Sequence, residues 1–336
     1  MLTLLLAALI GVATPQPVTI TASDGTTLAC SIVEPDGAPP SGGWPAVILF
    51  HGLGQSHTDM EPIAVQALAP AGYASLECDA RGTGASGGVW GLDGPREDQD
   101  ARDLFNWLAA RPEISDTQIG AFGISLGGGA VWNATAAGVP FKAIVPVITW
   151  NNLNWSLWPN NVIKLGWGEL LYGAGLAEQG AEHAQGDSGS VNQAALSSGN
   201  PFALTSGGDG GMQIGGYDPM IHYSEVTGAA LGYPDHTTLG WFGQRSMAVY
   251  GAGPQGHMPD VPTLLEQGTV DTLFNLNDAW NNYLLMKGRH PTLPVKLIAF
   301  CGGHVSCPTG AAPGCYGSSW GTTLTVVSWV VEHTTS

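Results

Sequence analysis

Residues 118–129 have the sequence QIGAFGISLGGG, an apolar run that ends in the pattern Gly-x-Ser-x-Gly. Small residues on both sides of Ser125 permit the sharp strand-to-helix turn called a nucleophile elbow, where larger side chains would clash. In such a turn the serine hydroxyl is free, and the backbone N–H of the next residue faces the reacting carbonyl. Glycine and serine are abundant in this chain, so the pattern predicts catalysis only if the remaining sequence supplies partners for Ser125.

Predicted strands and helices alternate on both sides of this turn. Residues 17–22 and 27–33 are predicted to form a β-hairpin around Asp24 and Gly25. Further strands are expected at 45–50, 73–78, 118–124, 142–148, 262–267 and 295–300, and helices at 60–71, 95–110 and 130–137. This alternation predicts an α/β fold, with a mostly parallel, doubly wound sheet and helices on both faces.

The alternation stops between residues 149 and 261. A segment of this length inside a compact domain is typical of a cap or lid over a site. The expected organisation is a leader, a first core part, a helical cap insertion and a second core part, at residues 1–16, 17–148, 149–261 and 262–336. Aromatic rings of the insertion either form the core of the cap or line an aromatic substrate pocket, and they belong to Trp150, Trp155, Trp158, Trp167 and Trp241.

Two later segments supply the partners that Ser125 needs. A serine hydroxyl is a poor nucleophile unless a base takes its proton and an acid orients that base. When the nucleophile is on an elbow of this kind, the acid and then the histidine follow it in sequence, each after a late strand. Asp271 follows the strand predicted at 262–267, and His304 follows the strand predicted at 295–300. We therefore predict a triad of Ser125, Asp271 and His304.

Competing acids and bases fit this pattern less well. His51 belongs to another loop, His257 precedes the strand before Asp271, and His333 lies in a predicted terminal helix. Among the acids, Asp260 also precedes that strand and Asp278 lies within a predicted helix. Asp271 and His304 therefore remain the predicted partners.

The oxyanion that forms during acyl transfer needs two donors that are already in position. The backbone N–H of Leu126, directly after the nucleophile, is one predicted donor. The N–H of Leu53, in the loop after the strand at 45–50, is the other. Each such donor typically contributes about 3 kcal/mol of transition-state stabilisation.

A glycine pattern in the first half of the chain resembles a dinucleotide-binding fingerprint. Gly82, Gly84 and Gly87 have the spacing G-x-G-x-x-G after a predicted strand. A nucleotide-binding loop opens a helix at once, whereas further glycines and Pro95 delay the helix here. The sequence also lacks a C-x-x-C pair that would suggest zinc. We therefore expect no cofactor and no metal.

Composition restricts the partners of this protein. With 27 acidic against 10 basic residues the net charge is -17, which disfavours nucleic acid and anionic membranes as partners. The 44% of hydrophobic residues can fill a sizeable core. We expect a small-molecule or peptidic acyl substrate, no nucleic acid and no stable membrane insertion. The oligomeric state is not predicted.

The N-terminus and the cysteines bear on the compartment. Residues 1–12 form an apolar run too short to span a bilayer, followed by small residues that suit signal cleavage, although no basic residue precedes the run. We expect a secreted or cell-envelope protein. Cys307 and Cys315 could close a small disulfide in one loop, and Cys30 and Cys78 lie in strands that could be neighbours. Cys301 is left over, and each cysteine could instead be a buried apolar residue.

Several motifs together resemble a known family. They are DARGTGASGG at 79–88, the helix that carries Asp103 and Trp107, GISLG at 123–127, and WFGQRS at 241–246. This set resembles the Xaa-Pro dipeptidyl-peptidase-like and cocaine-esterase-like α/β-hydrolases, over about residues 45–331. The resemblance implies an α/β-hydrolase fold and a Ser/Asp/His hydrolase that cleaves esters or amides through an acyl-enzyme.

The chain departs from that family in two respects. Members with a C-terminal jelly-roll domain continue beyond the last helix, whereas this chain stops at Ser336, so either that domain is absent or the chain is truncated. Some members also supply an oxyanion donor from a tyrosine, where this chain has HGLG at 51–54. This second departure moves the expected function toward ordinary esterases and acyl-peptidases, so we expect a serine hydrolase of carboxylic esters, or of amides.

Two alternatives to an esterase remain. One is an Xaa-Pro dipeptidyl-peptidase or another acyl-peptidase. A dipeptidyl-peptidase needs a carboxylate in the cap to hold the amino terminus of its substrate, and the candidates are Glu169, Glu178, Glu182 and Asp187. The alternative from another class is a catalytically silent binding protein with the same fold.

Overall fold

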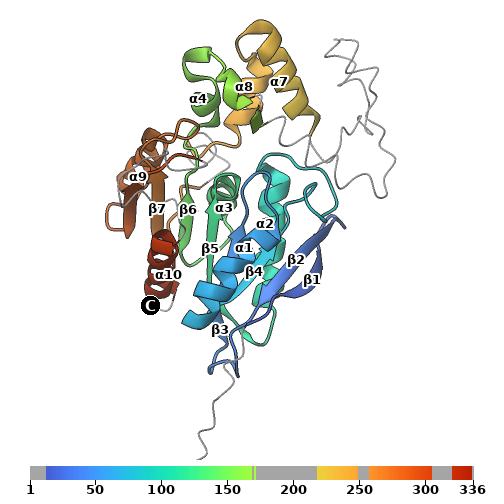
Figure 1. Ribbon diagram of the computed structural model, residues 1–336, viewed down its shortest axis with the longest axis vertical. Helices are drawn as coiled ribbons and strands as arrows, with labels where there is room; N and C mark the ends of the chain where they lie inside the picture. Colours follow the sequence, from blue (N-terminus) through green and yellow to red (C-terminus); the bar gives the residue numbers. More distant parts are fainter. Residues whose placement is uncertain (1–12, 169, 172–217, 249–256, 305–319, 335–336) are drawn as a thin grey trace, which may run out of the picture.

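One sheet of eight strands runs through the molecule, in the order β1-β2-β4-β3-β5-β6-β7-β8 (Figure 1). The computed structural model describes residues 13–168, 170–171, 218–248, 257–304 and 320–334. The strands are β1 (Gln16–Thr21), β2 (Thr27–Val33), β3 (Trp44–Phe50), β4 (Ala74–Cys78), β5 (Ile114–Ile124), β6 (Ile144–Val147), β7 (Thr263–Gly268) and β8 (Val295–Phe300). β1 and β2 form an antiparallel hairpin and β2 pairs antiparallel with β4, whereas the six strands from β4 to β8 in this order are parallel.

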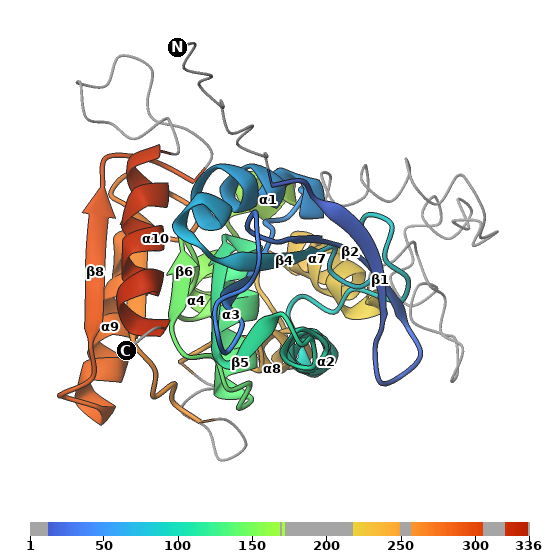
Figure 2. The ribbon, with the colours of Figure 1, turned by 90° about the horizontal axis from the view of Figure 1, so that it is seen from below.

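Helices cover both faces of the sheet, which confirms the doubly wound fold (Figure 2). One face carries α2 (Pro95–Ala109), α3 (Leu126–Ala136) and α9 (Leu276–Arg289). The other carries α1 (His57–Ile63), η1 (Ala64–Leu68), η2 (Ala69–Ala71) and α10 (Trp320–Thr334). The helix predicted at 60–71 begins three residues earlier, at His57, and continues after α1 as a π-helical segment and a 3-10 segment. The helix predicted at 130–137 begins directly after Ser125.

The predicted cap leaves the sheet after β6 and returns to it at β7. Its described helices are α4 (Leu153–Leu157), η3 (Pro159–Asn161), α7 (Pro219–Leu231) and α8 (His236–Gly243), which lie above the carboxyl ends of the parallel strands (Figure 1). The candidate carboxylates Glu169, Glu178, Glu182 and Asp187 lie outside the described residues, as do Cys307 and Cys315 and the predicted leader up to residue 12. Within the described ranges, no helix is both long and apolar enough to cross a bilayer.

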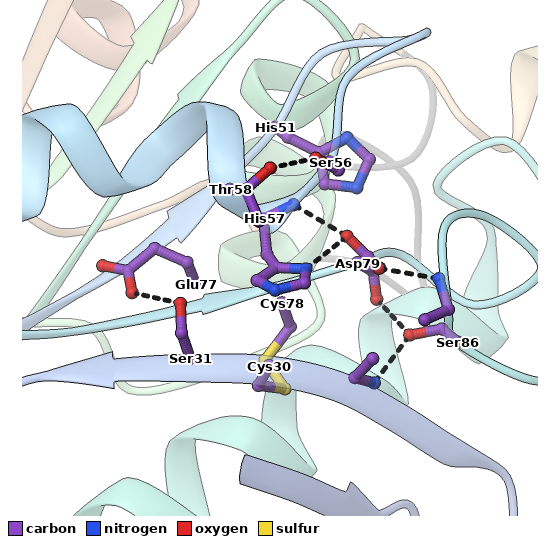
Figure 3. A network of polar contacts seen from close by, with 12 residues as sticks. Cys30, Ser31, His51, Ser56, His57, Thr58, Glu77, Cys78, Asp79 and Ser86 are labelled. Atoms are coloured by element: carbon purple, nitrogen blue, oxygen red, sulfur yellow. Dashed lines mark hydrogen bonds and ion pairs between the residues drawn. A yellow bond between two sulfur atoms is a disulfide. The ribbon is translucent and has the colours of Figure 1, made fainter. Parts of the chain in front are cut away.

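The end of β4 is tied to its neighbours by a disulfide and a buried carboxylate (Figure 3). Cys30 and Cys78 face each other in the β2–β4 pair and are bonded, as the sequence allowed. Asp79 then accepts hydrogen bonds from the backbone N–H of His57 at 2.7 Å and that of Ala85 at 2.8 Å. A Cβ atom on Gly84 would lie 2.1 Å from Asp79 Oδ2, so this glycine serves the turn around the aspartate.

Glu77 is fully buried in β4 and makes the stability of the protein depend on pH. Burial raises the pKa of its carboxyl from 4.5 to about 8, and hydrogen bonds from serine hydroxyls, including that of Ser31, act in the opposite direction. In the unfolded chain Glu77 ionises near its ordinary pKa, so folding stability falls as the pH rises from about 4.5 to about 8.

We therefore expect Glu77→Gln to raise Tm by about 3 °C at pH 8.5, for a gain of roughly 2 kcal/mol, and to change it little at pH 4.5. Differential scanning fluorimetry at the two pH values measures this. Glu61→Gln is the matched control, since Glu61 shares the Ser31 hydroxyl but is only half-buried. A Tm gain that is equal at both pH values would contradict the expectation.

Candidate active site

Ser125 stands at the sharp turn between β5 and α3. Its backbone has φ 56° and ψ -112°, a strained conformation for a residue other than glycine. The turn is possible because its glycines have no side chain. A Cβ on Gly123 would lie 2.0 Å from the carbonyl oxygen of Gly127, and one on Gly127 would lie 2.1 Å from that of Phe50. The pattern Gly-x-Ser-x-Gly therefore forms an elbow for steric reasons.

The structure brings the three predicted triad residues together. Ser125 Oγ lies 2.8 Å from His304 Nε2, and His304 Nδ1 lies 2.8 Å from Asp271 Oδ2. The side chains of His304 and Asp271 are 9% and 0% exposed. A carboxylate accepts hydrogen bonds, so Nδ1 carries the proton toward Asp271 and Nε2 is left to accept the proton of the serine hydroxyl.

The loop after β7 holds the Asp271 carboxylate in place. Oδ1 accepts hydrogen bonds from the backbone N–H of Leu273 at 2.8 Å and that of Phe274 at 3.0 Å. Oδ2 accepts from the side chain of Gln267 at 3.1 Å as well as from His304. The same amide group of Gln267 also donates to the carbonyl of Phe274. These donors fix the orientation of the carboxylate and compensate its burial.

The cap contacts this acid loop directly. Lys164 Nζ donates to the carbonyls of Thr272 and Leu273 at 2.9 and 3.0 Å, and the Trp167 indole N–H donates to Thr272 Oγ1 at 3.1 Å. The Trp167 ring meets the His304 ring edge to face at 5.8 Å. Burial lowers the pKa of Lys164, and the negative charges of Asp278 and Asp271 act in the opposite direction. Residues of the insertion therefore help to form the surroundings of the predicted triad.

The predicted oxyanion donors lie beside Ser125. Leu126 is the first residue of α3, where backbone N–H groups have no acceptor within the helix. Leu53 lies in the loop after β3 and lines the same pocket as Ser125 and Leu126. His51 is buried and structural, because its Nε2 accepts the N–H of Ala80 at 3.0 Å and burial lowers its pKa.

A pocket between core and cap opens onto Ser125. Its cavity volume is about 110 Å³, and most of its described lining is aliphatic or aromatic. Lys164 is the one charged side chain in that described lining. Together with Ser125, the lining includes Leu92, Leu126, Trp150, Trp158, Phe242 and Phe274. The arrangement can therefore take up an apolar group next to a nucleophile.

The tryptophans of the insertion divide between the two predicted roles. Trp150 and Trp158 are buried and also line the pocket, so they serve the cap core and the cavity together. Trp167 lies against His304, and Trp241 packs under the guanidinium of Arg245. Trp155 is 49% exposed and is not among the residues that line this pocket.

The competing acids and bases lie elsewhere. Asp260 is exposed and pairs with His290, and His257 is also exposed. Asp278 caps α9 and accepts a hydrogen bond from Ser156 Oγ, while His333 is on α10. The structure thus brings only the predicted pair, Asp271 and His304, to Ser125 among the candidates considered.

Four residues around the site were not found from the sequence. Trp90 and Leu92 line the pocket from the loop before α2, Lys164 reaches the acid loop, and Arg245 holds the loop before α2. Their partners lie far away in the sequence, so local periodicity contains no signal for them. Arg245 belongs to the motif WFGQRS at 241–246, but the motif does not indicate which groups its side chain contacts.

Comparison with known proteins gives both a family and a partial relative. A family model described as X-Pro dipeptidyl-peptidase (S15 family) matches residues 24–306. An Escherichia coli protein, described as an uncharacterized 31.7 kDa protein in the traX-finO intergenic region, is 35% identical over 102 residues. The alignment covers 30% of this chain and 36% of that protein, so it spans little more than a third of the relative's length.

Solved structures share the fold. The esterase Pf2001 of Pyrococcus furiosus is 17% identical, with a TM-score of 0.57 over 96% of this chain and 94% of that chain. The α/β-hydrolase GrgF of Penicillium sp. sh18 is 18% identical, with a TM-score of 0.57 over 96% of this chain and 100% of that chain. The family model spans most of the chain, and the structure has the α/β-hydrolase fold of these proteins. The chain is therefore a hydrolase that belongs to the X-Pro dipeptidyl-peptidase (S15) family.

Proposed function

We propose that this protein is a serine hydrolase that cleaves carboxylic esters with an apolar acyl group, through an acyl-enzyme. The observation that carries the proposal is the hydrogen-bonded series from Asp271 through His304 to Ser125, with the serine opening into a mainly apolar pocket. Similarity of fold alone would not support this activity, because proteins with one fold can have many different functions.

The proposed reaction has two halves. Ser125 Oγ attacks the acyl carbonyl carbon while His304 Nε2 takes the hydroxyl proton. The tetrahedral intermediate then loses the alcohol, to which His304 returns that proton, and an ester between Ser125 and the acyl group remains. A water molecule repeats the attack with His304 as base, which releases the acid and restores the serine. Asp271 holds the imidazole in the required tautomer and stabilises the imidazolium.

The backbone N–H groups of Leu53 and Leu126 are the proposed oxyanion donors. The position of Leu126 at the start of α3 also brings the positive end of the helix dipole to the developing charge. Loss of one such donor typically lowers kcat by about 10²- to 10³-fold.

A peptidase that acts on Xaa-Pro bonds is the second candidate, and membership of the S15 family favours it. A dipeptidyl-peptidase must bind a positively charged amino terminus. In the described lining the charged group is the Lys164 ammonium, which repels such a substrate. We therefore rank ester hydrolysis first.

We also propose that the protein is exported to the cell envelope or the medium. The apolar run at residues 1–12 and the Cys30–Cys78 disulfide support this proposal, since disulfides persist mainly in oxidising compartments.

The test uses the full chain with two kinds of probe. A fluorophosphonate should label the protein with one group per chain, on the peptide that contains Ser125, and p-nitrophenyl butyrate should be hydrolysed much faster than Gly-Pro-p-nitroanilide. Faster cleavage of the anilide would select the peptidase. If the protein were not labelled and hydrolysed neither substrate, the result would favour the alternative of a catalytically silent binding protein.

A further inference from the structure

The loop before α2 contains two residues in a backbone conformation that suits glycine. Leu92 has φ 57° and Asp93 has φ 53°. The left-handed region is uncommon for residues other than glycine, and a bulky leucine is especially unfavourable there. The flanking positions, Gly91 and Gly94, are already glycines, so two strained residues stand between two permissive ones.

Side chains from three separate segments hold this loop. The Glu97 carboxylate, on α2, accepts the backbone N–H of Gly91. Arg245, just after α8, donates from Nε to the Gly91 carbonyl at 2.6 Å. Asn133, on α3, donates to the Asp93 carbonyl at 2.9 Å. Such a set of bonds explains how a strained conformation persists in the folded protein.

Arg245 is itself fixed in position. Its guanidinium lies 3.4 Å from the centre of the Trp241 ring, and Nη1 donates to the Trp241 carbonyl at 2.8 Å. Burial lowers the pKa of Arg245 to about 10, while Glu97 and other nearby carboxylates act in the opposite direction, so the group stays charged at neutral pH. The loop therefore has little freedom to relax.

The strained conformation has one evident structural consequence. It places the Leu92 side chain in the wall of the pocket that contains Ser125, Leu126 and Trp150. Glycine would adopt the same φ without strain, so the conformation alone does not account for a leucine. The side chain must therefore be what this position contributes, because backbone strain tends to persist where it positions a functional group.

We infer that Leu92 is a specificity-determining residue, whose isobutyl group contacts the acyl chain of the substrate and favours short acyl groups over long ones. This inference rests on the proposed ester hydrolase function. It adds a size limit to that function, set by a residue outside the triad and outside the cap.

The test compares kcat/KM for p-nitrophenyl butyrate and p-nitrophenyl octanoate. Leu92→Gly should lower the value for butyrate and raise the octanoate-to-butyrate ratio by about tenfold, as expected for removal of a few apolar carbons from a pocket. Its Tm should stay within about 4 °C of the native value, because relief of strain offsets lost burial and added chain freedom.

Asp93→Gly is the matched control. It gives the same backbone freedom one residue along the chain but leaves the Leu92 side chain in place, so the ratio should stay at the native value. An unchanged ratio in Leu92→Gly, or an equal change in Asp93→Gly, would overturn the inference.

Leu92→Asn keeps the test decisive if the glycine variant does not fold. Asparagine tolerates the left-handed region and is similar in size to leucine, but it is polar. We expect it to raise KM for both esters by about tenfold, with a smaller change in kcat. An unchanged KM would count against the inference. A native protein that hydrolyses neither ester and is not labelled would instead refute the proposed function.

Discussion

Replacing Ser125 with alanine is expected to lower kcat for p-nitrophenyl butyrate by roughly 10⁴- to 10⁶-fold and to abolish fluorophosphonate labelling. The methyl group of alanine cannot form the acyl-enzyme, so only water activated by His304 and the oxyanion donors would remain. Alanine lacks the Oγ that lies 2.8 Å from His304 Nε2 but needs no new space at the turn. Circular dichroism should therefore match that of the native protein.

The control for this variant is Ser41→Ala, which removes a serine hydroxyl from an exposed loop far from the triad in the sequence. It should retain native kcat and labelling. If Ser125→Ala still reacted with the probe at the native rate, another nucleophile would have to be responsible, and the proposed mechanism would be abandoned.

Asp271→Asn is expected to lower kcat by about 10⁴-fold with little change in KM. The amide oxygen can keep the hydrogen bonds from Leu273 and Phe274, which places the NH₂ group toward His304 Nδ1. Two donors would then face each other, and the imidazole would relieve this by moving its proton to Nε2. In that tautomer His304 cannot accept the proton of Ser125.

Stopped-flow measurement of the acylation burst separates this effect from a change in substrate binding. Asp260→Asn is the control, because the sequence offered Asp260 as an alternative acid and it lies exposed beside His290. We expect native rates from that control. A similar loss of kcat in both variants, or none in Asp271→Asn, would refute the assignment of Asp271.

Order along the chain was enough to predict the fold and the convergence of Ser125, Asp271 and His304. The sheet requires buried strands at intervals, and the carboxyl ends of parallel strands meet at one edge, so Ser125, Asp271 and His304 could be assigned to that edge from their positions after predicted strands. The elbow was also predictable from the pattern Gly-x-Ser-x-Gly, and the structure gives the reason for its glycines, since Gly127 approaches Phe50 too closely for any side chain.

The surroundings of the triad could not be predicted in this way. The bond from Arg245 to Gly91 and those from Lys164 to the acid loop each connect segments that are over a hundred residues apart. Neither segment has a periodicity that depends on the other. The positive φ of Leu92 could not be predicted for a similar reason. The hydrogen bonds that hold its loop come from α2, from α3 and from Arg245 after α8.

The Cys30–Cys78 bond gives the protein tolerance to backbone cleavage in one region. The bond closes a covalent ring that contains β3, the loop with Leu53 and the exposed residues 36–42. A protease that cut that exposed loop would produce two chains that stay joined, and Ser125, Asp271 and His304 all lie on the second of them. In an environment rich in proteases, a molecule nicked there would keep its first two strands attached to the sheet and all three triad residues on one intact segment.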